Sequence, residues 1–317
     1  MSKIALFGAA GAVGRSIAQA LRAQNQPYRV VGRSRAALQA QFGADPLAEL
    51  VTWDPEDPAS VRAAAAGIDT LIYLVGVDYW RFALHPLLME KTLAGAVAEG
   101  VRHFVLIGTV YPYGPARTEL VTEQHPREPH TFKGRMRKAQ EDLLLAAHAA
   151  GRIQASVLRL PDFYGPGVEK SLLGSAFTAA VRGSTADLIG PLDRPHQFVY
   201  IPDLGPLVLK LAAHSGAYGR VWHFAGSGIT SQQEVLAEIE RQTGRPLKRR
   251  VVGKGVLRLL GLFNRMLREL VEMHYLFTDP VLMDDRALEG LLGAVSRTPY
   301  LEGIRSTLAY ESARQAK

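Results

Sequence analysis

Three glycines near the start of the chain have the spacing of a phosphate-binding turn. Gly8, Gly11 and Gly14 follow the apolar run Lys3–Phe7 and precede a segment with a helical pattern. A strand, a glycine turn and a helix N-terminus together direct free backbone N–H groups and the positive end of the helix dipole at a bound anion. An ordinary strand-to-helix turn is the alternative, but it would not need three glycines. The pattern predicts dinucleotide binding by the backbone of this turn, with contacts at Gly8, Gly11, Ala12, Val13 and Gly14.

Two residues that follow predicted strands bear on which dinucleotide binds. Arg33 comes just after the predicted strand Tyr28–Val31, at the position that faces the adenosine ribose. An acidic residue there selects NAD, whereas arginine accommodates the 2′-phosphate of NADP. Arg33 therefore predicts NADP, with a solvated surface arginine as the alternative. Asp54 is expected to accept a hydrogen bond from the adenine amino group, or else to cap a helix.

The elements that must position these residues alternate along the first half of the chain. Apolar runs predict strands at Lys3–Phe7, Tyr28–Val31, Leu50–Trp53, Thr70–Val75, His103–Ile107 and Ala155–Leu160. Helical patterns lie between them at Arg35–Gln41, Ala59–Ala66, Pro86–Glu99 and Phe132–Ala150. This βα alternation predicts an α/β fold with a Rossmann-type, doubly wound parallel sheet. Ligands of such sheets bind at the carboxyl ends of the strands.

The alternation stops after Pro161, where glycine and proline become concentrated. We expect residues 1–165 to form an NADP-binding domain to which residues 196–245 return. Residues 166–195 and 246–317 are expected to form a smaller, mainly helical substrate lobe that faces the glycine turn across a groove. Within it, Val256–Leu276 is rich in leucine but interrupted by arginine and glutamate. We expect an amphipathic helix over the substrate cleft, with a membrane-surface helix as the alternative.

Composition excludes several classes of protein. The 317 residues contain no cysteine, so there is no disulfide, thiolate nucleophile or cysteine-based metal site. The net charge is +7, but the basic residues are scattered, which argues against a nucleic-acid partner. The nine histidines show no metal-ligand spacing and no G-x-S-x-G motif occurs, so no metal site or hydrolase is expected. The first residues enter a strand without a signal-peptide pattern, which favours the cytoplasm.

Five segments together resemble the extended short-chain dehydrogenase/reductase family, whose members include NAD-dependent epimerases and dehydratases. The resemblance covers nearly the whole chain and rests on Gly8–Gly14, Thr109–Gly114, Arg159–Pro166, Phe198–Asp203 and Leu301–Ile304. It implies a catalytic role for Thr109 and cofactor contacts at Val75, Gly76, Pro161 and Phe163.

The chain departs from this family at the catalytic pair, which is a tyrosine and a lysine four residues later. None of the eleven tyrosines has a lysine at that spacing. Alignment through Glu141 places Lys133 at the tyrosine position and Arg137 at the lysine position, and shifts of one residue do not restore the pair. The resemblance therefore identifies an atypical member.

Lys133 and Arg137 would share one face of a helix and point into the cleft. A like charge and burial are both expected to lower the pKa of Lys133, which suits a lysine acid or base. Arg137 would hold the nicotinamide ribose or a substrate carboxylate. Two solvated cations are the alternative. His125 and His130, just before this helix, are the reserve acid–base candidates.

The leading interpretation is an NADP(H)-dependent oxidoreductase that transfers hydride to a small carbonyl or an activated alkene. Thr109 and Lys133 would lie around the reacting oxygen. A nucleotide-sugar epimerase or dehydratase is one alternative, disfavoured by the missing tyrosine. A catalytically silent NADP-binding redox sensor is another. The expected partners are a small-molecule substrate and, as a candidate, a second copy of the chain, without stable membrane insertion.

Overall fold

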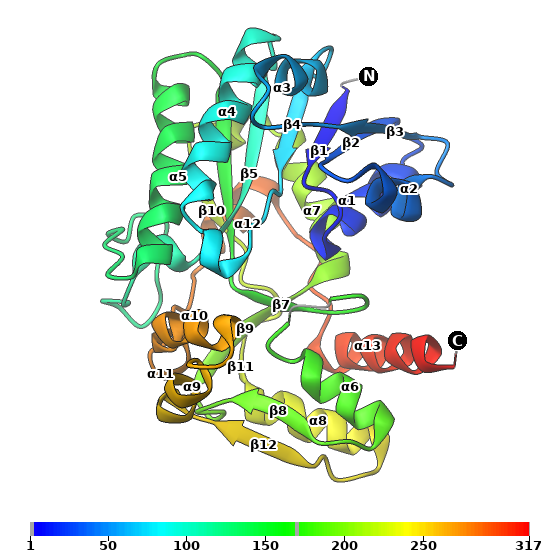
Figure 1. Ribbon diagram of the computed structural model, residues 1–317, viewed down its shortest axis with the longest axis vertical. Coiled ribbons are helices and arrows are strands. Elements are labelled where there is room, and N and C mark those ends of the chain that lie inside the picture. The colour runs from blue at the N-terminus through cyan, green and yellow to red at the C-terminus, as the bar shows by residue number, and fades with distance from the viewer. Residues whose placement is uncertain (1–2, 169–170, 317) are drawn as a thin grey trace.

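A seven-stranded parallel sheet forms the larger part of the molecule (Figure 1). The structure is a computed structural model that describes residues 3–168 and 171–316. The strand order is β10-β6-β5-β4-β1-β2-β3, with every neighbouring pair parallel. The strands are β1 (Ile4–Phe7), β2 (Tyr28–Gly32), β3 (Ala48–Thr52), β4 (Thr70–Tyr73), β5 (His103–Thr109), β6 (Gln154–Leu160) and β10 (Val221–His223). The predicted Rossmann-type α/β fold is confirmed.

Helices cover both faces of this sheet, so every residue of its central strands β1 and β4 is buried. Successive residues of β1 show the two faces: Ile4 and Leu6 belong to one buried cluster, Ala5 and Phe7 to the other. The first cluster includes side chains of α1 (Ala12–Ala23), α2 (Arg35–Phe42), α7 (Ile201–Ala213) and α12 (Arg286–Leu292). The second includes side chains of α3 (Pro58–Ala65), α4 (Leu84–Ala98) and α5 (Phe132–Ala149). Helix α1, which follows the glycine turn, is held against one face of the sheet by these buried side chains.

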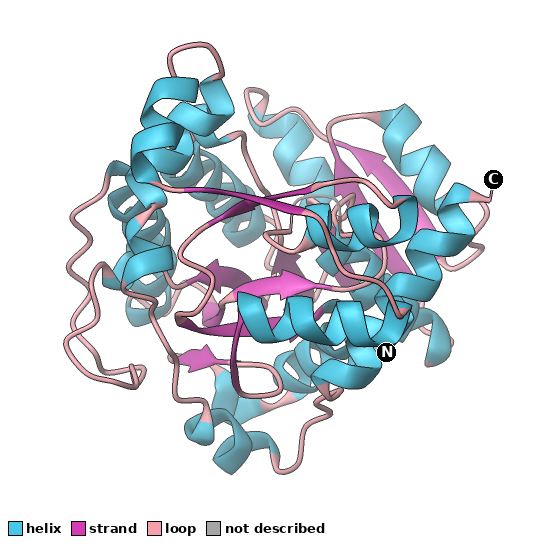
Figure 2. Ribbon diagram, turned by 90° about the horizontal axis from the view of Figure 1, so that it is seen from below, coloured by secondary structure: helices cyan, strands magenta, loops and turns pink. Residues whose placement is uncertain are grey.

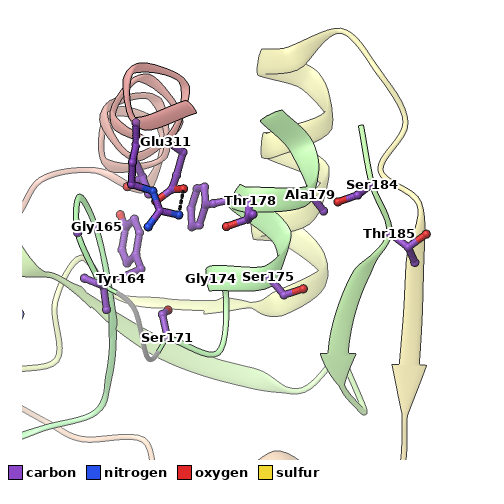
Figure 3. A pocket seen from close by; sticks show the side chains of 15 residues that line it. Tyr164, Gly165, Ser171, Gly174, Ser175, Thr178, Ala179, Ser184, Thr185 and Glu311 are labelled. Atoms are coloured by element: carbon purple, nitrogen blue, oxygen red, sulfur yellow. Dashed lines mark hydrogen bonds and ion pairs between the residues drawn. The ribbon is translucent and has the colours of Figure 1, made fainter. Parts of the chain in front are cut away.

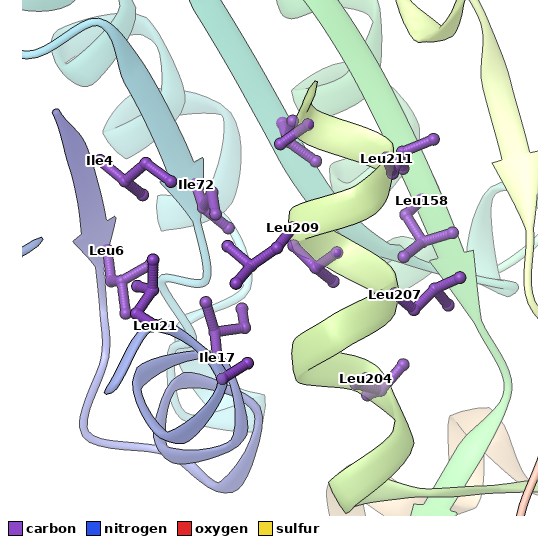
Figure 4. Close-up of a cluster of buried hydrophobic side chains, with 14 of the residues drawn as sticks. Ile4, Leu6, Ile17, Leu21, Ile72, Leu158, Leu204, Leu207, Leu209 and Leu211 are labelled. Atoms are coloured by element: carbon purple, nitrogen blue, oxygen red, sulfur yellow. The ribbon is translucent and has the colours of Figure 1, made fainter. Parts of the chain in front are cut away.

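Helix α1 packs unusually closely on α7 (Figure 4). A Cβ atom on Gly205 of α7 would lie 2.2 Å from the carbonyl oxygen of Ser16, so only glycine fits there. The Ser16 hydroxyl donates to the Ile201 carbonyl at 2.8 Å and accepts from the Gly205 amide at 2.9 Å. Ile17 and Leu21 pack into the same cluster, and burial of each contributes about 1.5–3 kcal/mol. These contacts hold α1, and therefore the glycine turn, in a fixed position.

The smaller lobe contains two short sheets besides its helices, which the sequence analysis did not predict. One has the order β11-β9-β7, and in the other β8 pairs with β12. Their strands are β7 (Asp162–Tyr164), β8 (Ala186–Ile189), β9 (Pro195–Tyr200), β11 (Ile229–Ser231) and β12 (Arg249–Val252). The sequence analysis assigned residues 196–245 to the large domain. Within this range, β10 is a strand of the large sheet and α7 packs against that sheet. In contrast, β9, β11 and α8 belong to the smaller lobe.

The remaining helices surround these small sheets, as the view from below shows (Figure 2). Helix α6 packs against both α8 and α13. The helices of this lobe are α6 (Gly174–Arg182), α8 (Gln232–Thr243), α9 (Lys254–Leu260), α10 (Arg265–Met273), α11 (Tyr275–Thr278) and α13 (Tyr300–Gln315).

The prediction of one continuous helix over Val256–Leu276 was wrong. The segment forms α9, a turn, α10 and α11. The chain turns at Gly261, where an added Cβ would lie 2.9 Å from the Cα of Arg268. Asn264 then begins α10, because its side chain accepts from the amide of Leu267 at 3.2 Å. Across residues 3–168 and 171–316, no helix combines the length and apolar character needed to cross a bilayer.

Candidate functional site

The glycine turn has the geometry of a phosphate cradle. Gly8 has φ of +85°, and a Cβ there would lie 2.7 Å from the backbone of Val75, just after β4. A Cβ on Gly14 would lie 2.2 Å from the carbonyl oxygen of Ala9. Gly11 differs, since a Cβ there would meet no atom within 4 Å and no side chain caps the N-terminus of α1. Packing thus requires the outer two glycines, and the amides of Ala12 and Val13 stay open to an anion.

Side chains from two helices hold the outer part of this turn. The carbonyl of Ala10 accepts from Arg15 at 3.3 Å and from Gln41 at 3.0 Å. Arg15 also donates, at 2.5 Å, to the carbonyl of Gly167, which follows β7 in the chain. A cavity of about 230 Å³ lies beside the first turn of α1, lined by Ala12, Arg15, Gln41 and Pro166 among others. The glycine turn is therefore tied both to α2 and to the smaller lobe.

Arg33 lies free at the end of β2. It is exposed, and within the described part of the chain it forms no hydrogen bond or ion pair. The neighbouring Arg35, in contrast, donates to the carbonyl of Leu50 at 2.6 Å. Asp54 is exposed and accepts from the amide of Glu56 at 2.9 Å, so one carboxylate oxygen stabilises its own turn. Asp54 does not cap α3, because Asp57 occupies the N-cap.

The carboxyl ends of β5 and β6 lie next to each other and bring further predicted residues together. Thr109 is the last residue of β5 and is paired with Leu160 of β6. Its hydroxyl oxygen accepts from the amide of Tyr111 at 3.3 Å, which leaves its O–H free to donate. Pro161 follows, and Phe163 packs against the same apolar cluster as Ala12 and Val13. Gly76, after β4, is exposed and has open space beside it.

Lys133 lies in the first turn of α5, and its side chain is only 1% exposed. Its ammonium donates to Glu269 at 2.5 Å and to Glu272 at 2.7 Å, both on α10. The backbone amide of Lys133 also donates to Glu272, at 3.1 Å. The ammonium therefore contacts carboxylates, not the cationic neighbour that the helix spacing predicted. Lys133 is therefore held in a buried contact between α5 and α10.

Arg137 is also buried, but it points toward the sheet. It donates to the carbonyl of Ile107 in β5 and to Nδ1 of His85, both at 3.2 Å. Burial lowers the pKa of Arg137, and burial together with the Arg137 charge lowers the pKa of His85 to about 2. His85 is therefore neutral, which lets Nδ1 accept. Within the described residues no carboxylate lies within ion-pair distance of Arg137. Neither Lys133 nor Arg137 is a solvated cation.

Two tyrosines that the sequence analysis did not select lie beside Lys133. The hydroxyls of Tyr79 and Tyr111 are 2.7 Å apart, and the Lys133 ammonium lies 5.8 Å from the centre of the Tyr79 ring. Burial raises the pKa of both phenols. The charge of Asp162, which pairs with His196 at 2.8 Å, raises them further. Tyr111 and Asp162 lie inside family-like segments of the sequence, whereas no local pattern marks Tyr79.

The reserve acid–base candidates have other contacts. His125 is buried, with Nε2 accepting from the amide of Arg117 at 3.0 Å and Nδ1 donating to the carbonyl of Pro126 at 2.9 Å. Both ring nitrogens of His125 are thus used in hydrogen bonds that stabilise the loop before α5. His130 is exposed and lies edge-on to the ring of Tyr275.

A second cavity, of about 380 Å³, lies in the smaller lobe between α6 and α13 (Figure 3). Hydroxyl side chains such as Ser175 and Thr178 line it, together with the ion pair of Glu311 and Arg314. It contains none of the predicted site residues. Among residues 3–168 and 171–316, no group of three histidine, aspartate or glutamate side chains is arranged to hold a metal ion.

The sequence profile of the NAD dependent epimerase/dehydratase family matches residues 4–224. The dTDP-6-deoxy-L-talose 4-dehydrogenase (NAD(P)(+)) of Kitasatospora kifunensis is 30% identical over an alignment of 256 residues that covers 75% of this chain and 79% of that enzyme. Uncharacterized protein y4nL of Sinorhizobium fredii is 27% identical over 198 residues, covering 59% of this chain and 55% of that protein. The chain belongs to the NAD dependent epimerase/dehydratase family.

A solved structure shows the same fold. The dTDP-glucose 4,6-dehydratase DesIV of Streptomyces venezuelae, with NAD and TYD bound, superimposes with a TM-score of 0.82. It is 19% identical and covers 99% of this chain and 98% of its own. The family is one of NAD-dependent epimerases and dehydratases, and the Kitasatospora and DesIV proteins are a dehydrogenase and a dehydratase, which agrees with the phosphate cradle. The resemblance to extended short-chain dehydrogenases is confirmed.

Proposed function

We propose that this chain is an NADP(H)-dependent reductase that transfers hydride to a small carbonyl compound. Support for a dinucleotide comes from the open N-terminus of α1 and from Gly11, where nothing blocks the approach of a pyrophosphate. Support for NADP over NAD comes from Arg33, whose exposed guanidinium has no partner within the described residues. Asp54 stays a candidate for the adenine amino group, through the carboxylate oxygen that its turn does not use.

The ion pairs of Lys133 support reduction, and not oxidation, of the substrate as the proposed reaction. A charged ammonium can donate a proton to an oxygen, or stabilise a developing alkoxide, but it cannot remove a proton from a hydroxyl. Reactions that begin by oxidising a sugar hydroxyl need a base at this position. Glu269 and Glu272 stabilise the charge on Lys133. This arrangement favours reduction of a carbonyl over the epimerase and dehydratase reactions.

The other residues would orient the substrate. The free O–H of Thr109 would donate to the carbonyl oxygen that Lys133 protonates. Arg137 would position Thr109, because it donates a hydrogen bond to the carbonyl of Ile107, two residues earlier on β5. Pro161 and Phe163 would contact the nicotinamide half of the cofactor. NADPH, when bound, supplies the hydride.

The test begins with NADPH oxidation against a panel of small ketones, aldehydes and enones. Sugar ketones belong in the panel, because the Kitasatospora relative is named as a deoxysugar dehydrogenase. With a substrate in hand, Lys133→Met should lower turnover by about a hundredfold to ten-thousandfold, the usual contribution of one general acid. NADPH affinity should not change.

Lys138→Met is the matched control. Lys138 lies on the same helix and pairs with Asp142 at 2.8 Å, and its removal should leave turnover unchanged. Thermal unfolding separates loss of chemistry from loss of fold, since Lys133→Met leaves two carboxylates without their partner. Parent-like turnover in Lys133→Met would refute the role of Lys133. NADPH binding without turnover on any compound of the panel would instead support a redox sensor.

A further inference from the structure

The turn between α9 and α10 exposes a group of large apolar side chains. The exposed fractions are 88% for Phe263, 72% for Leu262 and 62% for Leu259. Val256 and Leu260 are also exposed, at 46% and 41%. We call these five residues the α9–α10 tip. Single exposed apolar residues are common on protein surfaces, but a contiguous group of this size marks an interaction site.

The charges around the tip are almost all positive. Residues 248–273 contain seven lysines and arginines but only two acidic residues, Glu269 and Glu272. Both of these are engaged by the buried ammonium of Lys133. Lys254, Arg258 and Arg268 are exposed, and no described carboxylate lies within ion-pair distance of them. The tip is therefore an apolar surface beside three exposed cations, Lys254, Arg258 and Arg268, that have no ion-pair partner among the described residues, whereas Arg250 pairs with Asp187.

The opposite face of α10 is already occupied. Glu269 and Glu272 bind Lys133, and the guanidinium of Arg265 lies 4.9 Å from the centre of the Trp80 ring. These contacts hold α10 against α5 and the short helix η1 (Tyr79–Arg81). The α9–α10 tip thus projects from an anchored helix at the edge of the molecule (Figure 1).

Charge decides among the surfaces that could cover the tip. In a two-fold dimer the same patch would meet itself, which would bring Arg258 and Arg268 toward their own copies. An anionic lipid surface offers an apolar layer for the five side chains of the tip and negative phosphates for the cations beside them. Leucine and phenylalanine enter the boundary between headgroups and acyl chains, and arginine and lysine contact the phosphates. We propose that the α9–α10 tip attaches this enzyme reversibly to anionic membranes.

The test is co-sedimentation of the full chain with vesicles of equal parts phosphatidylglycerol and phosphatidylcholine. The parent protein should sediment with these vesicles and not with vesicles of phosphatidylcholine alone. The double variant Leu262→Ser with Phe263→Ser should lower the partition coefficient by at least about thirtyfold, because two large apolar side chains no longer enter the bilayer. Arg258→Gln should lower it about fivefold, which corresponds to ~1 kcal/mol at the surface.

Matched controls come from outside the tip. Ile229→Ser removes a side chain that is 53% exposed on β11, and Arg152→Gln removes an exposed arginine beyond α5. Neither should change vesicle binding, and each variant should keep the parent unfolding temperature. Equal binding to neutral vesicles, or unchanged binding of the double serine variant, would overturn the proposal. So would an absence of vesicle binding by the parent, and a dimer in sedimentation velocity that the serine variant abolishes would then assign the tip to a second copy of the chain. Because the readout is vesicle binding, the outcome does not depend on the proposed reaction.

Discussion

Replacing Arg33 by alanine should weaken the binding of NADP and leave the binding of NAD nearly unchanged. Arg33 has no intramolecular hydrogen bond or ion pair within the described residues, so its removal leaves no partner unsatisfied in the free protein. The change therefore acts on the complex alone. A hydrogen bond to a charged group contributes about 1.5–3 kcal/mol, and solvent exposure of Arg33 argues for the lower part of that range. The expected loss of NADP affinity is about tenfold to thirtyfold.

Isothermal titration calorimetry of the parent and of Arg33→Ala with each dinucleotide measures this directly. Arg35→Ala is the control, because Arg35 is also exposed but donates to the carbonyl of Leu50. That variant should shift the unfolding temperature and leave the ratio of the two affinities unchanged. Equal binding of NAD and NADP by the parent would refute the assignment. An equal loss for both dinucleotides in Arg33→Ala would show that Arg33 acts on the shared part of the cofactor.

Two further predictions concern the glycine turn and the effect of acid. Gly14→Ala should lower stability by about 1–3 kcal/mol, because its Cβ would clash with the carbonyl of Ala9. Gly11→Ala should leave the unfolding temperature unchanged but weaken dinucleotide binding, as calorimetry would show; loss of stability in Gly11→Ala and not in Gly14→Ala would contradict both. Burial and the nearby Arg159 charge lower the pKa of His223 to about 3. Below pH 6.5, His223 is therefore protonated in the unfolded chain but stays neutral in the folded chain. The contribution of His223 to stability should therefore fall by about 2 kcal/mol between pH 7 and pH 5, and thermal unfolding of His223→Gln should show a weaker dependence on pH than the parent.

Local sequence patterns were sufficient for strands β1 to β6 of the large sheet. Its strands are apolar runs separated by helical patterns, and each of these signals extends over neighbouring residues. The three-residue strands β7 and β11 are too short to show a period, and they lie among glycines and prolines. The break between α9 and α10 did have a local signal, since Gly261 and Asn264 are typical of a helix end and a new N-cap.

Partners distant in the chain could not be predicted in the same way. The sequence placed Lys133 and Arg137 on one helix face, which is a matter of spacing alone. Whether each side chain then meets a carboxylate or a carbonyl depends on elements that pack there from elsewhere. Glu269 and Glu272 lie more than 130 positions from Lys133. Their charges interrupt the leucine-rich run, but nothing local assigns them to a lysine.

The contact between Lys133 and α10 also affects how tightly a substrate can bind. Any motion that moves α10 away from α5 separates a buried ammonium from both of its carboxylates. Breaking a buried pair costs about 3–5 kcal/mol, so a form with this contact broken would make up only about one molecule in 10² to 10⁴ at rest. A substrate that had to enter through that form would bind with its apparent affinity reduced by the same fraction. A compound whose own anionic group took the place of Glu269 or Glu272 beside Lys133 would avoid this penalty. Such a compound would bind more tightly than a neutral one of the same shape.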